Sequence, residues 1–208
     1  MPLTHLPLTD LLAMFRSSEP TPGGGSASAL AGAVGASLLV MVAGLAKPRA
    51  EDAEGISRLL AAGRACEALS TRLSALVDRD SDAYDMVVAA FRMPKGSDEE
   101  KRDRGLRIQE ALQAATEVPL EIMRACAEAL DRGAVVAVTG NRNAASDTLV
   151  GFELLAAGLR GARANVEINL GSIKDAVFVA ASRVEAAKLA ATAESGLAAA
   201  RTILTGAA

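Results

Sequence analysis

The longest uncharged run in the chain lies near its start, from Thr21 up to the first charged residue, Lys47. It opens with the turn sequence Pro22-Gly-Gly-Gly-Ser26 and continues with Ala, Gly, Ser, Leu and Val, and Pro48 follows it. A turn, an apolar run and a proline stop predict a helix that is apolar on all sides and must be buried. The run also meets the length criterion for a membrane span. Its internal glycines and its lack of aromatic anchors favour the core of a helical bundle instead.

The rest of the chain shows helical spacing of apolar residues nearly throughout. Residues 8–15 predict a short amphipathic helix, and residues 50–93 predict a very long one between two prolines. Ser97 and Glu100 form a capping-box pattern that starts a helix to about Arg132, with a kink at Pro119 and an end at Gly133. The apolar stripe of the first long helix is Leu59, Cys66, Leu69, Leu73, Val77, Tyr84, Val87 and Phe91, and that of the second is Leu112, Ala115, Val118, Ile122, Cys126 and Leu130.

The last third of the chain predicts further helices. The short apolar run Ala134–Val138 fits a strand or a helix, and we interpret it as helix. Asn143 or Ser146 is expected to cap the next helix, which carries Leu149, Phe152, Leu155 and Leu159 inward. Ser172–Asp175 has the spacing of a second capping box before an Ala-rich helix that ends near Leu204. We therefore expect one all-α domain over residues 1–208, a multi-helix bundle with long antiparallel helices around a central helix of small residues.

One acid breaks the pattern of the first long helix. Between Val77 and Tyr84, steps of three and four place Asp80 at a core position. Asp78 and Asp82 fall on other sides of the helix and fit solvated surface positions. Asp80 fits a buried acid paired with an arginine or a local break in the helix. It also fits a functional carboxylate, because carboxylates with perturbed pKa values gather at active sites.

Composition narrows the function classes. Half of the 208 residues are hydrophobic but 2% are aromatic, and this favours closely packed helices. A net charge of −3 argues against nucleic-acid binding, and the absence of a basic start followed by an apolar run argues against a signal peptide, so we expect a cytoplasmic protein. One histidine and two dispersed cysteines cannot build an ordinary zinc site, although a magnesium site of carboxylates alone stays open. The glycine turn matches neither a P-loop nor a dinucleotide fingerprint.

Several stretches, in this order and spacing, resemble the cyclodeaminase/cyclohydrolase family of folate enzymes over nearly the whole chain. They are Pro22–Ser26 with its small-residue helix, Leu76–Asp80 with Ala83 and Tyr84, Ala90–Lys95, Val118-Pro119, Gly140-Asn141, Ser146-Asp147 and Asn165–Leu170. Met93 and Tyr84 stand where relatives often have Leu and Phe.

This resemblance implies an all-helical homodimer that acts on tetrahydrofolate derivatives without a metal or a tightly bound cofactor. It also implies that Asp80, which the periodicity singles out independently, is the catalytic residue. The glycine turn is expected to present backbone N–H groups to an anion. Arg92 and Lys95 are expected to bind the glutamate tail of the folate. The remaining candidates for substrate contact are polar. The expected substrate residues are Gly23, Gly24, Gly25, Ser26, Arg92, Lys95, Asn141, Ser146, Asp147, Asn165 and Asn169.

Two reactions fit the family. One hydrolyses 5,10-methenyltetrahydrofolate to 10-formyltetrahydrofolate, and the other closes 5-formimidoyltetrahydrofolate to the methenyl compound with loss of ammonia. We expect the cyclohydrolase, because the sequence carries no formiminotransferase domain of the kind that often accompanies the second activity. The alternative from another class is a non-enzymatic helical partner protein, or a membrane-associated subunit built around Thr21–Lys47.

Overall fold

The protein is an all-α bundle, seen in a computed structural model that describes residues 1–45 and 53–206. Pro48, expected to stop the buried helix, and the expected helix start at residue 50 lie outside the described residues. The elements are η1 (Leu3–His5), α1 (Leu8–Phe15), α2 (Gly24–Gly44), α3 (Ala53–Arg92), α4 (Asp98–Thr139), η3 (Arg142–Ala144), α5 (Ala145–Leu170) and α6 (Ala176–Thr205).

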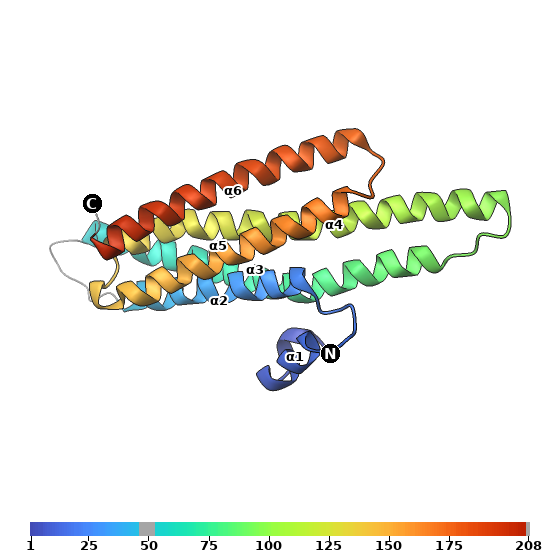
Figure 1. Cartoon of the computed structure of the whole chain (residues 1–208). Helices are drawn as coiled ribbons and strands as arrows, with labels where there is room; N and C mark the ends of the chain where they lie inside the picture. Colours follow the sequence, from blue (N-terminus) through green and yellow to red (C-terminus); the bar gives the residue numbers. More distant parts are fainter. Residues whose placement is uncertain (46–52, 207–208) are drawn as a thin grey trace.

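Helix α2 packs on α3, α4 and α5 and leaves one face open at Val34 and Met41, while α6 lies across α4 and α5 (Figure 1). Its small residues allow close approach. A Cβ on Gly35 would lie 2.7 Å from the carbonyl oxygen of Gly151 in α5, and one on Gly151 would lie 3.0 Å from that of Gly35. α2 is long and apolar enough to cross a membrane, yet half of its apolar window is buried inside the protein. The prediction of a bundle around this helix is confirmed.

Two of the long helices continue beyond the others. Figure 1 shows the end of α3 and the start of α4 projecting from one end of the bundle as a two-helix hairpin. The bundle stops at Gln109, whose side chain accepts from the N–H of Lys174 and donates to the carbonyl of Ser172, in the α5–α6 turn. We call residues 84–108 the arm. In this region two members of the expected apolar stripe are wrong, because Tyr84 and Phe91 are 42% and 51% exposed and the alanines Ala83 and Ala90 are buried instead, whereas Val87 packs against the core.

Helix α4 runs without interruption through Pro119 to Thr139. The expected end at Gly133 is therefore wrong, and the choice of helix for Ala134–Val138 is confirmed. Gly133 is buried, and a Cβ at this position would lie 2.7 Å from the side chain of Leu39 and 3.1 Å from that of Phe152, so only glycine fits this close packing. A glycine can thus mark close packing as well as a helix end.

Three expected helix starts can be compared with the structure. The capping box of Ser97 and Glu100 is present. α5 has no side-chain cap, and Asn141 instead caps the short η3, so the expected caps at Asn143 and Ser146 are wrong. The cap of α6 is Asp175 rather than Ser172, and its Oδ1 accepts from the N–H groups of Val177 and Phe178.

The N-terminal segment is tied to the bundle beside the acid-rich part of α3. Asp78 accepts hydrogen bonds from the backbone N–H of Leu3 and the hydroxyl of Thr4. Asp78 therefore anchors η1 and is not the freely solvated acid that was expected. Leu11 packs inward from α1, whereas Leu8 and Leu12 remain exposed, so that helix buries less than its pattern predicts.

Candidate active site

The site is formed where α2 begins against the middle of α3. The Asp80 carboxylate reaches from α3 to the first turn of α2, and its Oδ2 accepts from the backbone N–H of Ser26 at 2.8 Å. A Cβ on Gly25 would overlap this carboxylate. Glycine at position 25 is therefore what allows an acid of another helix to sit against the α2 backbone.

The hydroxyl of Ser26 connects three groups on α3. It lies 2.8 Å from the carbonyl oxygen of Val77, 3.2 Å from Oδ2 of Asp80 and 3.2 Å from the hydroxyl of Ser81. Ser26 is fully buried. A hydroxyl can donate one hydrogen bond and accept two, so Ser26 can bond to several of these groups at once. Ser26 and Ser81 therefore form a small hydrogen-bond network that holds the Asp80 carboxylate in place. Sequence reasoning missed Ser81, although its place beside Asp80 in a family motif was a usable signal.

The pKa of the Asp80 carboxyl is raised above its ordinary value of 3.8. Burial is the largest cause, because it disfavours the charged form, and the hydrogen bonds from the side chain and backbone of Ser26 oppose it. Oδ2 receives both Ser26 bonds. Within the described residues Oδ1 receives none, so this oxygen is available to a water molecule or a substrate.

No cation of this chain pairs with Asp80 in the described residues. The neighbouring Arg79 instead extends to Glu121 on α4 at 2.7 Å, and Arg72 reaches the same acid at 3.0 Å. Of the alternatives for Asp80, the buried acid paired with an arginine is therefore not found among the described residues. An acid with a raised pKa and no protein cation is suited to a cationic ligand or to proton transfer.

The glycine turn supplies donors next to this acid. Gly23 is the N-cap of α2, and as a glycine it has no side chain to accept from the N–H groups of the first turn. In the described part of the chain, the N–H groups of Gly24 and Gly25 have no hydrogen-bond acceptor. The first turn of a helix with free N–H groups favours an anion or a developing negative charge.

The two asparagines expected at the site have different environments. Asn165 lies beside the turn, because a Cβ on Gly24 would be 3.5 Å from its Nδ2, and that Nδ2 donates to the carbonyl of Gly161 in its own helix. Its Oδ1 has no donor among the described residues. Asn169 donates to the carbonyl of Ala115 on α4 at 2.8 Å, so it ties two helices together.

The other expected site residues lie elsewhere in this chain. Arg92 follows Asp80 by twelve residues of continuous helix, about 18 Å along the axis, and Lys95 lies beyond it at the tip of the arm. Asn141, Ser146 and Asp147 lie at the opposite end of α2, since Gly140 approaches Val42. Ser26 and Val42 are sixteen residues apart, about 24 Å. The structure thus gathers Gly23–Ser26, Asp80 and Asn165, with Asn169 one turn further along α5. Within this chain it separates the other candidates from them: Arg92, Lys95, Asn141, Ser146 and Asp147.

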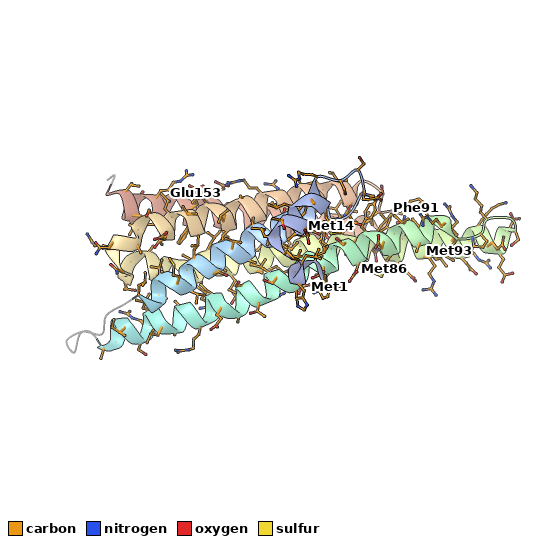
Figure 2. All side chains as sticks on the ribbon, turned by 90° about the horizontal axis from the view of Figure 1, so that it is seen from below. Met1, Met14, Met86, Phe91, Met93 and Glu153 are labelled. Atoms are coloured by element: carbon orange, nitrogen blue, oxygen red, sulfur yellow. The ribbon has the colours of Figure 1, made fainter. Side chains whose placement is uncertain are left out.

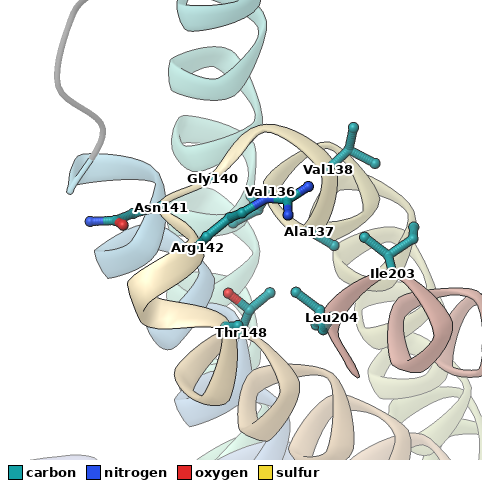
Figure 3. A pocket seen from close by; sticks show the side chains of 10 residues that line it. Val136, Ala137, Val138, Gly140, Asn141, Arg142, Thr148, Ile203 and Leu204 are labelled. Atoms are coloured by element: carbon teal, nitrogen blue, oxygen red, sulfur yellow. The ribbon is translucent and has the colours of Figure 1, made fainter. Parts of the chain in front are cut away.

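The far end of the bundle has its own hollow of about 180 Å³. It is lined by the η3 region, including Asn141 and Arg142, by Thr148 of α5 and by Ile203 and Leu204 of α6 (Figure 3). Thr148 already donates to the carbonyl of Ala144. In the described residues, no three His, Cys, Asp or Glu side chains group in a way that could hold a metal ion, here or at Asp80.

Comparisons with known proteins agree with one another. Residues 7–188 match the family model described as formiminotransferase-cyclodeaminase. A methenyltetrahydrofolate cyclohydrolase of Methylorubrum extorquens is 41% identical over 162 residues, which cover 78% of each chain. A formimidoyltransferase-cyclodeaminase of Sus scrofa is 32% identical over 87% of this chain, which spans 34% of that longer protein.

A solved structure shares the fold. The crystal structure of a formiminotetrahydrofolate cyclodeaminase from Thermotoga maritima superposes with a TM-score of 0.86 at 28% identity, over 97% of each chain. The resemblance drawn from the sequence motifs is confirmed. The chain belongs to the formiminotransferase-cyclodeaminase family.

Proposed function

We propose that this protein is a methenyltetrahydrofolate cyclohydrolase that hydrolyses 5,10-methenyltetrahydrofolate to 10-formyltetrahydrofolate. One observation carries the proposal. Asp80 is a half-buried acid with a raised pKa, and none of the described residues forms an ion pair with it. The methenyl substrate brings a cation delocalised over N5, the bridge carbon and N10. Its charge complements the Asp80 carboxylate, and the relative with 41% identity bears the name of this activity.

The proposed reaction uses Oδ1 of Asp80, the oxygen without a protein donor. A water held by Oδ1 adds its oxygen to the bridge carbon while the carboxylate takes one of its protons. The neutral adduct then loses its hydroxyl proton, the bond from the carbon to N5 breaks, and N5 takes up a proton, which leaves the formyl group on N10. The sum consumes one water and releases one proton. The free N–H groups of Gly24 and Gly25 are placed to stabilise negative charge on the new oxygen.

The second candidate is the cyclodeaminase reaction, favoured by the fold of the Thermotoga maritima enzyme and by the longer relatives. Here N10 attacks the carbon of the protonated formimidoyl group, the proton of N10 passes to the amine nitrogen, and the bond from the carbon to that nitrogen breaks, so that ammonia leaves and the methenyl cation forms. Asp80 is the group that moves this proton. Parallel assays with 5,10-methenyl- and 5-formimidoyltetrahydrofolate, at equal enzyme concentration, distinguish the reactions by which substrate gives the larger kcat/KM.

Asp80→Asn is the direct test of the mechanism. The amide keeps the size of the side chain but cannot accept a proton, so kcat should fall about 100-fold or more. Asp82→Asn is the matched control, because Asp82 is an exposed acid on the same helix, and it should keep wild-type activity. Near-normal turnover of Asp80→Asn, with folding intact by circular dichroism, would remove Asp80 from the mechanism.

We further propose that the protein is a cytoplasmic homodimer whose substrate is a free folate, with no tightly bound cofactor. Association is supported by the exposed apolar side chains of Met86 (Figure 2) and Leu106 on the arm, and by a hollow of about 440 Å³ between α3 and α4 that Met86 lines. Light scattering should give twice the chain mass of 21.2 kDa. A monomer that turns over at the full rate would contradict this part, and activity lost to a chelator would contradict cofactor independence.

A further inference from the structure

The face of α3 that carries Asp80 continues into the arm, where it carries an aromatic residue. Tyr84 follows Asp80 by four residues, so the two side chains are neighbours on the helix, with Cβ atoms about 5–6 Å apart. Side chains on a helix lean toward its N-terminus, which directs the Tyr84 ring toward the carboxylate.

Packing does not explain this tyrosine. The ring is 42% exposed, and on this part of α3 the buried contacts are made by the small residues Ala83 and Ala90. Within the described residues, the Tyr84 hydroxyl has no hydrogen-bond partner. An exposed aromatic ring of this size beside a site is available for stacking on a flat ligand.

We propose that Tyr84 binds the substrate by stacking its ring on one of the two flat ring systems joined to the bridge carbon. This inference rests on the proposed function, because it takes the bridge carbon to lie at Asp80. Of the two nitrogens of the bridge, N5 is a member of the pterin ring system and N10 carries the p-aminobenzoyl ring. A substrate whose bridge meets Oδ1 of Asp80 therefore places one ring within a helical turn of the carboxylate, where Tyr84 stands.

Enzyme kinetics provide the first test. Tyr84→Leu should raise the KM for 5,10-methenyltetrahydrofolate roughly five- to tenfold with little change in kcat, while Tyr84→Phe, which keeps the ring, should stay near wild type. Phe91→Leu is the matched control. Phe91 lies on the same face, is 51% exposed and lies seven residues further along the helix, about 10 Å from Tyr84. It should leave KM unchanged.

The chain offers a second readout, because Tyr84 is its one tyrosine and it has no tryptophan. Tyrosine fluorescence therefore reports on this residue alone. Titration with the stable folate 5-formyltetrahydrofolate should quench it strongly. The double variant Tyr84→Phe/Phe91→Tyr, which moves the reporter along the same face, should bind equally well by calorimetry but show weaker quenching after correction for ligand absorbance.

The outcomes separate the two proposals. If wild type neither binds folate by calorimetry nor turns it over, the proposed function is wrong and the stacking falls with it. If wild type is active but Tyr84→Leu keeps a normal KM, only the stacking is overturned. An equal KM rise in Phe91→Leu, or a shift of Tyr84→Leu to a different oligomer by light scattering, would also overturn it, because Tyr84 would then act through the arm or an interface.

Discussion

The backbone N–H of Ser26 donates to the carboxylate of Asp80 across 2.8 Å, and the two residues are fifty-four positions apart in the chain. The acid therefore serves as a cap for the first turn of α2 from a neighbouring helix. Capping lowers its pKa, yet burial raises it by more, so the carboxyl remains easier to protonate than an ordinary aspartic acid. One contact thus places the acid and adjusts its proton affinity.

Ser26→Ala should shift the pH dependence of the reaction. The variant keeps the backbone N–H but loses the hydroxyl, which lies 3.2 Å from Oδ2 and lowers the pKa of Asp80. Because the base must be ionised, kcat/KM falls as the pH drops through the raised pKa, and this acid limb should move to higher pH in the variant. The measurement is a pH–rate profile of both proteins. A limb that stays in place or moves to lower pH would contradict the assignment of Asp80 as the titrating group.

The glycine at position 25 should not tolerate a side chain. In Gly25→Ala the new Cβ would overlap the Asp80 carboxylate, so the acid must move, and kcat should fall at least tenfold. Gly24→Ala is the matched control, since its Cβ would meet the amide of Asn165 at 3.5 Å, an ordinary contact. Steady-state kinetics of both variants, with thermal melts to confirm folding, check this difference. Equal losses in both would point to the turn as a whole.

Removing the charge at Asp80 should stabilise the folded protein at neutral pH. A raised pKa in the folded state means that the protonated form is favoured there, so stability is fully present below the unfolded pKa, near 3.8, and is lost as pH rises through the folded value. Asp80→Asn mimics the protonated form. Its Tm should equal or exceed that of wild type at pH 7, and the difference should shrink as the pH falls toward 4. A variant that melts well below wild type at pH 7 would show that the ionised acid contributes net stability.

Apolar spacing was sufficient to predict the helices, but the expected burial of α2 on all sides is only partly right, because Val34 and Met41 are exposed. Leu59, Leu73 and Val77 were assigned to the core from the pattern, and all three are fully buried. The same pattern failed at Tyr84 and Phe91. Periodicity identifies the apolar face of a helix, but it does not show whether another helix packs on that face. Beyond Asp80, α3 has lost α2 as a neighbour, and only the tertiary arrangement reveals this.

The site was predictable in part for a similar reason. Asp80 was identified twice, as an acid on an apolar face and by its place in a family motif, and the structure brings it to the glycine turn. Asn141 and Asp147 belong to motifs of the same family but lie at the other end of the bundle. A sequence motif shows which residues recur in a family, but it does not show how far these residues lie from the rest of the site in the folded chain. Their roles, and those of Arg92 and Lys95, remain predictions.

Asn169 and Pro119 form a pair that explains how α4 continues through a proline. Pro119 has no N–H, so the carbonyl of Ala115, four residues earlier, lacks its helical donor. The side chain of Asn169 on α5 supplies this donor at 2.8 Å. Asn169→Ala should therefore lower the free energy of unfolding by about 1 kcal/mol or more while KM stays normal, which makes the residue structural.

A double-mutant cycle tests this pair directly. Pro119→Ala restores an N–H to α4, so in that background the loss of Asn169 should cost clearly less than it does in wild type. Denaturant unfolding of the four proteins measures the coupling, and Asn165→Ala provides the matched control, because its amide bonds only within its own helix. If Asn169→Ala costs the same in both backgrounds, the asparagine does not replace the missing proline N–H. If it raises KM without lowering stability, Asn169 belongs with the substrate residues after all.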